Sequence, residues 1–112
     1  MTIFKENDKN FIFLRQSKHG SKITTVPQGL WFTVKDKFSG NVKISKLLND
    51  GIFQNEDGSW RIEITALDTL DLASGNYVCD VKVKDEMGRE FTIVKPEDFR
   101  ILDVVTRREN QR

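Results

Sequence analysis

Cys79 and His19 are the two side chains that could act together as a nucleophile and its base, and each is the only residue of its type. A cysteine thiolate becomes a catalytic nucleophile when a neighbouring histidine accepts its proton. However, Cys79 alternates in phase with Tyr77 and Val81, and this position in a strand predicts a buried, small apolar side chain. His19 lies in the turn-like segment Lys18–Ser21, where an exposed loop residue is expected. We therefore predict that the protein is not an enzyme.

Metal binding is the second kind of chemistry that the side chains could support. A zinc site needs about four ligands, which a single Cys and a single His do not supply. Calcium takes several oxygen ligands, but the Asp residues fall in different predicted turns and lack the spacing of a calcium-binding loop. We expect them to cap turns by accepting backbone hydrogen bonds, and we expect no metal or other cofactor. The residues considered are Asp8, Asp36, Asp50, Asp57, Asp68 and Asp71.

The charge balance argues against a general affinity for nucleic acid or for a membrane surface, because the formal net charge is +1. Residues 1–46 carry a net charge of +6, and residues 47–112 carry a net charge of −5. A bipolar domain could stack on its own copies or bind an acidic neighbour, and the alternative is a solvated surface of mixed charge. No apolar run approaches the roughly 18 residues of a membrane span, and the N-terminus lacks a secretory signal. The expected location is the cytoplasm, or a larger particle assembled there.

The composition favours sheet over helix. The 112 residues suit one domain, and they include 26 Val, Ile and Thr residues but only two Ala. β-branched residues are enriched in strands, whereas Ala is the best helix former. We expect a single domain over residues 1–106, followed by a polar, flexible tail at residues 107–112, which contains no apolar side chain.

Apolar and polar residues alternate along Ser59–Thr65 and Asn76–Lys84, which predicts strands with one face in the core. The side chains expected to point inward are Trp60, Ile62, Ile64, Tyr77, Cys79, Val81 and Val83. Further strands are predicted at Asn10–Arg15, Lys22–Val26, Leu30–Lys35, Gly51–Gln54, Glu90–Lys95 and Phe99–Val105. The segment Val42–Leu48 is either a short strand or a helical turn. Seven or eight short strands separated by Gly- and Asp-containing turns predict an antiparallel β-sandwich or barrel.

The residues around Tyr77 narrow this fold class to an immunoglobulin-like sandwich. Gly75 stands two residues before Tyr77, and Cys79 stands two residues after it. This spacing is similar to that at the corner before strand F of immunoglobulin-type domains, where the tyrosine hydroxyl bonds to a backbone group a few residues upstream. We expect Asp68 and Thr69 to bracket the same corner loop by side-chain bonds to the backbone.

Five segments follow one another in a distinctive order along most of the chain. They are LWFTVKD (residues 30–36), KISKLLNDGI (43–52), WRIEIT (60–65), LASGNYVCDVKV (72–83) and MGREFTIVKPEDFRILDVVT (87–106). This series resembles short β-sandwich domains encoded in bacteriophage structural-gene clusters, among them the immunoglobulin-like N-terminal domain of phage baseplate upper proteins. The resemblance spans about residues 10–106 and departs at Cys79, where an aromatic residue is common. It implies a tail or baseplate component of a virion, with other virion proteins or copies of itself as partners.

The last predicted strand is apolar on both faces, with Phe99, Ile101 and Val105 on one face and Leu102 and Val104 on the other. A two-layer sandwich buries only one face of each sheet. The second face should therefore meet the N-terminal segment, another copy or a virion neighbour. We expect such an interface to use Ile3, Phe4, Leu102 and Val104.

A free-standing module that binds carbohydrate or protein through its loops is the alternative function. Its expected platform is formed by Trp60 and Phe53, on either side of the Asp57-Gly58 turn.

Overall fold

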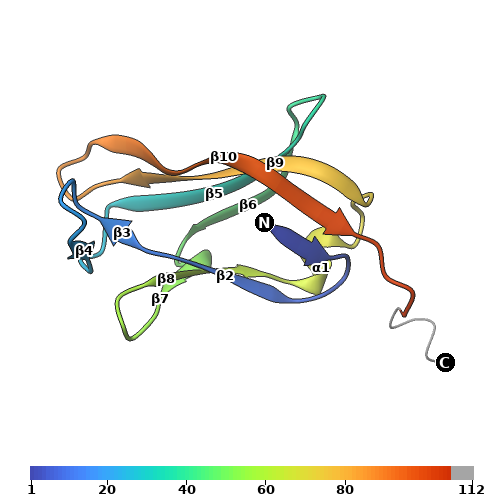
Figure 1. Ribbon diagram of the computed structural model, residues 1–112, viewed down its shortest axis with the longest axis horizontal. Coiled ribbons are helices and arrows are strands. Elements are labelled where there is room, and N and C mark those ends of the chain that lie inside the picture. The colour runs from blue at the N-terminus through green and yellow to red at the C-terminus, as the bar shows by residue number, and fades with distance from the viewer. Residues whose placement is uncertain (107–112) are drawn as a thin grey trace.

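Ten strands and one short helix form the described part of the chain, residues 1–106, in the computed structural model (Figure 1). The strands are β1 (Thr2–Phe4), β2 (Lys9–Phe13), β3 (Arg15–Gln16), β4 (Lys22–Ile23), β5 (Gly29–Asp36), β6 (Val42–Leu48), β7 (Gly51–Gln54), β8 (Trp60–Ile64), β9 (Gly75–Lys84) and β10 (Glu90–Leu102). The helix α1 spans Ala66–Thr69. The predicted all-β class is confirmed, and Val42–Leu48 is a strand rather than a helical turn. The predicted tail, residues 107–112, lies outside the described residues.

Eight of these strands form one sheet in the order β1-β10-β9-β5-β6-β7-β8-β2, while β3 and β4 form a separate two-stranded ribbon. The large sheet curls until it nearly closes into a barrel. Figure 1 shows β10, β9, β5 and β6 along one side, with β7, β8 and β2 along the other. The prediction of a purely antiparallel sheet is wrong at two strand pairs. The strand β1 runs parallel to β10, and β7 runs parallel to β6.

A short hydrogen-bonded loop between β6 and β7 explains why these two strands run parallel. Asn49 and Gly51 both have positive φ, at 66° and 99°. The N–H of Leu47 donates to the carbonyl of Asp50, and the N–H of Asn49 donates to the carbonyl of Ile52, both at 2.8 Å. The chain therefore makes a short loop after β6, and β7 then runs in the same direction as β6 on the other side of the barrel. A Cβ at Gly51 would collide with the side chain of Lys46, so both the backbone angle and the space favour glycine.

The core lies between the two sides of the barrel. All seven side chains predicted to point inward from Ser59–Thr65 and Asn76–Lys84 are buried, which confirms the strand register read from the alternation. Trp60 is the core tryptophan and is only 1% exposed. The fully buried rings of Phe32 and Phe99 lie 6.1 Å apart between centroids. Burying a side chain of this size contributes roughly 1.5–3 kcal/mol to stability.

The strand β10 replaces two predicted strands, Glu90–Lys95 and Phe99–Val105. Its pairing with β9 shifts register between Thr92 and Val94 and again between Val94 and Glu97, around Pro96. A bulge accommodates a proline, which has no N–H to donate to the ladder, so the strand continues through it. The strand ends at Leu102, and Val105 is 95% exposed. The prediction that Val105 belongs to this strand and shares one face of it with Phe99 and Ile101 is therefore wrong.

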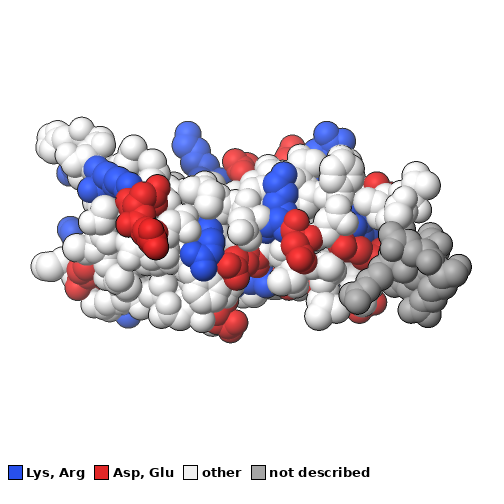
Figure 2. All heavy atoms as spheres, turned by 90° about the horizontal axis from the view of Figure 1, so that it is seen from below, with Lys and Arg blue, Asp and Glu red and all other residues white. Residues whose placement is uncertain are grey.

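Charged side chains of both signs intermingle on the face of the molecule shown in Figure 2. Strands from the basic first part of the chain lie between strands from the acidic second part in the sheet order. Ion pairs join the two parts, with N–O distances of 2.9, 2.7 and 3.6 Å, at Arg15–Glu86, Lys46–Asp68 and Lys37–Asp98. The charge difference along the sequence therefore does not give a bipolar surface on this face.

Candidate functional site

A cleft of about 690 Å³ opens between the β3–β4 ribbon and the hairpin formed by β9 and β10. Val83, Phe91 and Ile93 line it from the hairpin, and Leu14 and Ile23 line it from the opposite side. Val83 is buried, but Phe91 keeps 47% of its surface exposed and Leu14 keeps 49%. The cleft therefore presents apolar side chains to solvent, which is typical of a surface that binds another polypeptide.

The cleft remains open because β10 has a partner strand along only part of one edge. β9 pairs with β10 on one side, whereas β1 on the other side reaches only Arg100–Leu102. Within residues 1–106, no strand pairs with this second edge between Glu90 and Phe99. Pro96 and the register shifts protect the middle of that edge against strand addition, so binding here would rest on the side chains of the cleft.

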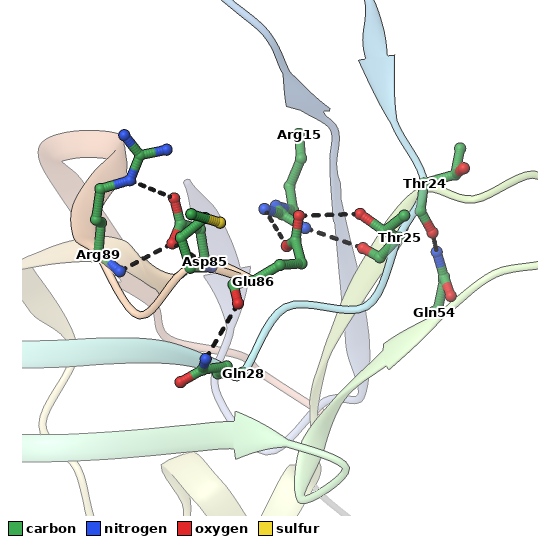
Figure 3. A network of polar contacts seen from close by, with 9 residues as sticks. Arg15, Thr24, Thr25, Gln28, Gln54, Asp85, Glu86 and Arg89 are labelled. Carbon is green, nitrogen blue, oxygen red and sulfur yellow. Dashed lines mark hydrogen bonds and ion pairs between the residues drawn. The ribbon is translucent and has the colours of Figure 1, made fainter.

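A polar network centred on Arg15 fixes one wall of the cleft (Figure 3). Arg15 is 5% exposed, and its guanidinium donates to the carbonyl of Thr25 and to the carboxylate of Glu86, both at 2.9 Å. The other carboxylate oxygen of Glu86 accepts from the Thr25 hydroxyl at 3.1 Å. The Gln28 amide donates to the carbonyl of Glu86 at 3.2 Å. These bonds join the segment after β4 to the β9–β10 turn, although the two are far apart in sequence.

The β9–β10 turn is itself held by Asp85. Its carboxylate accepts from the backbone N–H groups of Arg89, at 2.8 Å, and Met87, at 3.0 Å, and from the Arg89 side chain at 3.2 Å. The backbone bond from Arg89 is the largest of the effects that lower the pKa of Asp85. The turn that carries Glu86 is therefore rigid, and so is the guanidinium that Glu86 holds.

Nothing in the sequence pattern marked Arg15 as a functional residue. It closes a predicted strand, and its partner Glu86 is 71 residues away, so no local spacing connects the two. The apolar residues of the cleft were partly predictable, because Phe91 and Ile93 alternate in Glu90–Lys95. The exposure of Phe91 and Ile93 depends on which strand packs across from β10, and this is set by the tertiary structure.

The predicted catalytic candidates do not form a site. Cys79 is 3% exposed, and burial is the largest of the effects that raise the pKa of its thiol to about 11. Its sulfur lies 3.8 Å from the sulfur of Met1. His19 is exposed in the turn between β3 and β4. A buried thiol with a raised pKa is a poor nucleophile near neutral pH.

Several of the Asp residues do cap turns. Asp36 accepts from the N–H groups of Phe38 and Ser39, and Asp57 accepts from the N–H of Ser59. Asp8 instead accepts from the N–H of Ala66, the first residue of α1 and 58 residues away, so it does not cap its own turn. Among residues 1–106, no group of three or more His, Cys, Asp or Glu side chains is arranged to hold a metal ion.

At the predicted corner, the Tyr77 hydroxyl donates to the carbonyl of Ala73, four residues upstream, at 2.6 Å. Gly75 lies within this loop at φ 144° and is exposed. Asp68 and Thr69 also bond to backbone, but around α1. Asp68 accepts from the N–H of Thr65 at 2.7 Å, and Thr69 accepts from the N–H of Glu6 at 2.8 Å.

Asp68 also forms an ion pair with Lys46 at 2.7 Å, which ties α1 to β6. Burial alone would raise the pKa of Asp68, but the bonds from Lys46 and Thr65 outweigh this effect and leave the pKa lowered. The two residues thus anchor the helix that precedes the corner loop, rather than the corner hydroxyl itself.

The predicted interface residues lie close together on β1 and at the end of β10, but they do not form one exposed surface. Ile3 is 1% exposed and belongs to the core, so the prediction that it faces a partner is wrong. Phe4 is 52% exposed and is paired with Leu102 across β1 and β10. Val104 lies beyond the end of β10 and is half-buried. The end of β10 is not a free edge, because β1 already occupies it.

The platform expected for the alternative function is also incomplete. Trp60 is buried in the core and is not available to a ligand, so this prediction is wrong. Phe53 is half-buried, and the Arg61 guanidinium lies 5.1 Å from its ring centroid.

In comparison with known proteins, no family model matches the sequence, and no curated protein matches it significantly. No helix in the described part of the chain is long and apolar enough to cross a membrane.

Proposed function

We propose that this protein is a non-enzymatic structural or assembly component of a bacteriophage tail or baseplate, and that it binds a neighbouring virion protein through the cleft between β3–β4 and β9–β10. The observation that carries this proposal is the exposed apolar wall of the cleft, where Phe91 keeps 47% of its surface in solvent. When another chain covers these apolar side chains, they lose their contact with solvent, and this burial stabilises the complex.

The rigidity of the cleft supports the same function. The Arg15 network and the Asp85 turn fix both rims before a partner arrives, which lowers the entropy lost on binding. The thiol of Cys79 is buried, and within residues 1–106 the candidate catalytic side chains lie in separate elements. A binding role fits this arrangement better than a chemical one.

The assignment to a phage particle rests on the order of sequence segments that resembles phage β-sandwich domains. The finer classification as an immunoglobulin-like sandwich is part of the same proposal. The bond from the Tyr77 hydroxyl to the Ala73 carbonyl supports it, since a corner of this kind occurs in immunoglobulin-type domains. The two parallel strand pairs are departures from that architecture. Partners would be other virion proteins or further copies of this chain, and the location would be the virion or the host cytoplasm during assembly.

A free-standing protein-binding module is the second candidate, and the same cleft favours it. The carbohydrate-binding version has less support because Trp60 is buried.

Purified particles distinguish the two candidates. Phage particles induced from cells that carry the gene are banded on a density gradient, and their proteins are quantified by mass spectrometry. The proposal predicts this protein in the particle band at a constant ratio to the main tail protein. Its absence from that band, with the protein present in the soluble fraction of the same lysate, would overturn the virion assignment and leave the free-standing module.

A further inference from the structure

The turn between β5 and β6 projects from the body of the molecule (Figure 1) and carries Phe38 at its tip. Phe38 is 97% exposed, the highest value among the large hydrophobic side chains of residues 1–106. Val42, on the returning strand of the same hairpin, is 55% exposed. The Phe38 ring therefore contributes almost no burial to the fold, and packing within the chain does not explain an aromatic residue at this position.

The backbone of this turn is rigid. The Asp36 carboxylate accepts from the N–H of Phe38 at 2.8 Å and from the N–H of Ser39 at 2.9 Å. The N–H of Gly40 donates to the Asp36 carbonyl at 3.0 Å, and Gly40 takes a φ of 73°, which suits glycine. The base of Phe38 is thus held in one position without help from its ring. An anchor presented in this way loses little backbone entropy on binding.

Three lysines lie close to Phe38 in the sequence of this hairpin. Lys35, Lys37 and Lys43 are all exposed and lie within five residues of Phe38 in the sequence. Lys37 has a long ion pair with Asp98 at 3.6 Å, between two well-exposed side chains, which stabilises little. Lys43 acts on the one acidic group of the turn, Asp36, because it is among the groups that lower the pKa of that carboxyl, after the backbone hydrogen bonds from Ser39 and Phe38. Three lysines against one carboxylate leave the turn with a net positive charge.

We propose that the β5–β6 tip is a second binding surface, which inserts Phe38 into an apolar pocket rimmed by carboxylates on a partner protein. A buried aromatic anchor with charge pairs around it is the usual composition of an interface hot spot. This surface lies away from the cleft, and the inference does not depend on the virion assignment.

Two other binding partners for the tip, a membrane surface and a second copy of this chain, fit these observations less well. A membrane surface is disfavoured because even a whole myristoyl chain gives only marginal binding, and one phenyl ring buries less apolar area. A second copy of this chain offers the cleft described above, but the carboxylates of Asp85 and Glu86 at that cleft are already paired with Arg89 and Arg15, and Lys18 also lines it. The cleft therefore has no free carboxylate rim for the lysines of the tip.

Site-specific photocrosslinking tests the proposal. The photoreactive residue p-benzoylphenylalanine is placed at position 38 and, as a control, at position 67, since Leu67 is 78% exposed in α1 and does not line the cleft. Both variants are produced in the cells that naturally make the protein, and adducts are mapped by mass spectrometry. We expect position 38, and not position 67, to label one partner protein within a segment where Asp or Glu flank apolar residues.

A charge reversal completes the test. Lys43→Glu should lower the yield of the adduct from position 38 at least tenfold, whereas Lys95→Glu, at an exposed lysine of β10, should leave it unchanged. Thermal unfolding of each variant shows that the fold is retained. Adducts only to lipid, adducts only to another copy of this chain, equal labelling from both positions, the absence of any adduct, or insensitivity to Lys43→Glu would each overturn the proposal.

Discussion

The ring of Phe11 in β2 meets the ring of Phe99 in β10 edge-on, with 6.0 Å between centroids and 62° between planes. These strands lie at or near opposite ends of the sheet order, so the contact joins the two ends of the sheet across the core. Phe99 also packs against Phe32 in β5, which places one ring between three strands. The contact closes the barrel here, whereas the part of β10 before Phe99 has no strand paired with its second edge among residues 1–106, and the cleft forms there.

Removal of the Tyr77 hydroxyl should destabilise the fold. In Tyr77→Phe the buried ring still fills its place, but the carbonyl of Ala73, an exposed residue, loses its donor. We expect the free energy of unfolding to fall by about 0.5–1.5 kcal/mol, measured by urea unfolding. A loss of less than about half a kcal/mol would mean that water replaces the hydroxyl as donor, and that the corner is not a structural requirement.

Glu86→Ala should weaken the wall of the cleft. The substitution leaves the buried guanidinium of Arg15 with the Thr25 carbonyl as its remaining partner among the recorded bonds, and a buried charge without its counter-ion is unfavourable. We expect a loss of about 1–3 kcal/mol in the free energy of unfolding and faster amide exchange in residues 24–28. Glu56→Ala, at the equivalent position of the β7–β8 turn and exposed, is the matched control and should have almost no effect. Equal effects of the two substitutions would contradict the role given to Glu86.

Stability should fall at acid pH because turn-capping carboxylates titrate at lower pH in the folded protein. Backbone or hydroxyl hydrogen bonds are the main reason that the pKa values of Asp36, Asp57 and Asp85 lie below 3.8. A carboxyl with a lowered folded pKa adds stability above its unfolded pKa, and this stability is lost as the pH falls towards the folded value. We expect the urea midpoint to decrease between about pH 5 and about pH 2.

The control for this pH dependence is a pair of triple variants. Asn at positions 36, 57 and 85 keeps an oxygen acceptor but removes the charge, so the slope of stability with pH should become shallower. The second variant, Asp50→Asn with Glu56→Gln and Asp71→Asn, changes three exposed acids whose side chains accept no recorded hydrogen bond, and it should keep the slope of the natural protein. The same slope in both variants would show that turn capping does not produce the acid sensitivity.

The sequence predicted the parts of the fold that depend on local alternation. The register of β8 and β9 follows directly from the period-two pattern around Trp60 and Tyr77, because one face of each strand is buried. The strand β1 was not predicted because three residues are too few to show a period, and only its pairing with β10 explains the burial of Ile3. The sequence analysis predicted two strands where β10 is continuous, because no alternation pattern reveals the register shifts around Pro96.

The candidate site was harder to predict than the fold. The burial of Arg15 depends on Glu86, which is distant in sequence, and the exposure of Phe91 depends on where β1 stops along β10. Both are consequences of how the sheet closes. By contrast, the rigid tip at Phe38 follows from the local run Asp36–Gly40, but only the structure shows that nothing packs on the ring.

The incorporation of a cleft variant into particles tests the central claim most directly. Phe91→Lys places a charge in the apolar wall of the cleft, and Ile12→Lys makes the same kind of change at a residue of β2 that is 60% exposed and does not line the cleft. The two variants are first matched by their urea midpoints and then quantified in gradient-purified particles. We expect Ile12→Lys to enter particles as the natural protein does, and Phe91→Lys to fall at least tenfold below it. Equal incorporation of the two variants would contradict a binding role for the cleft.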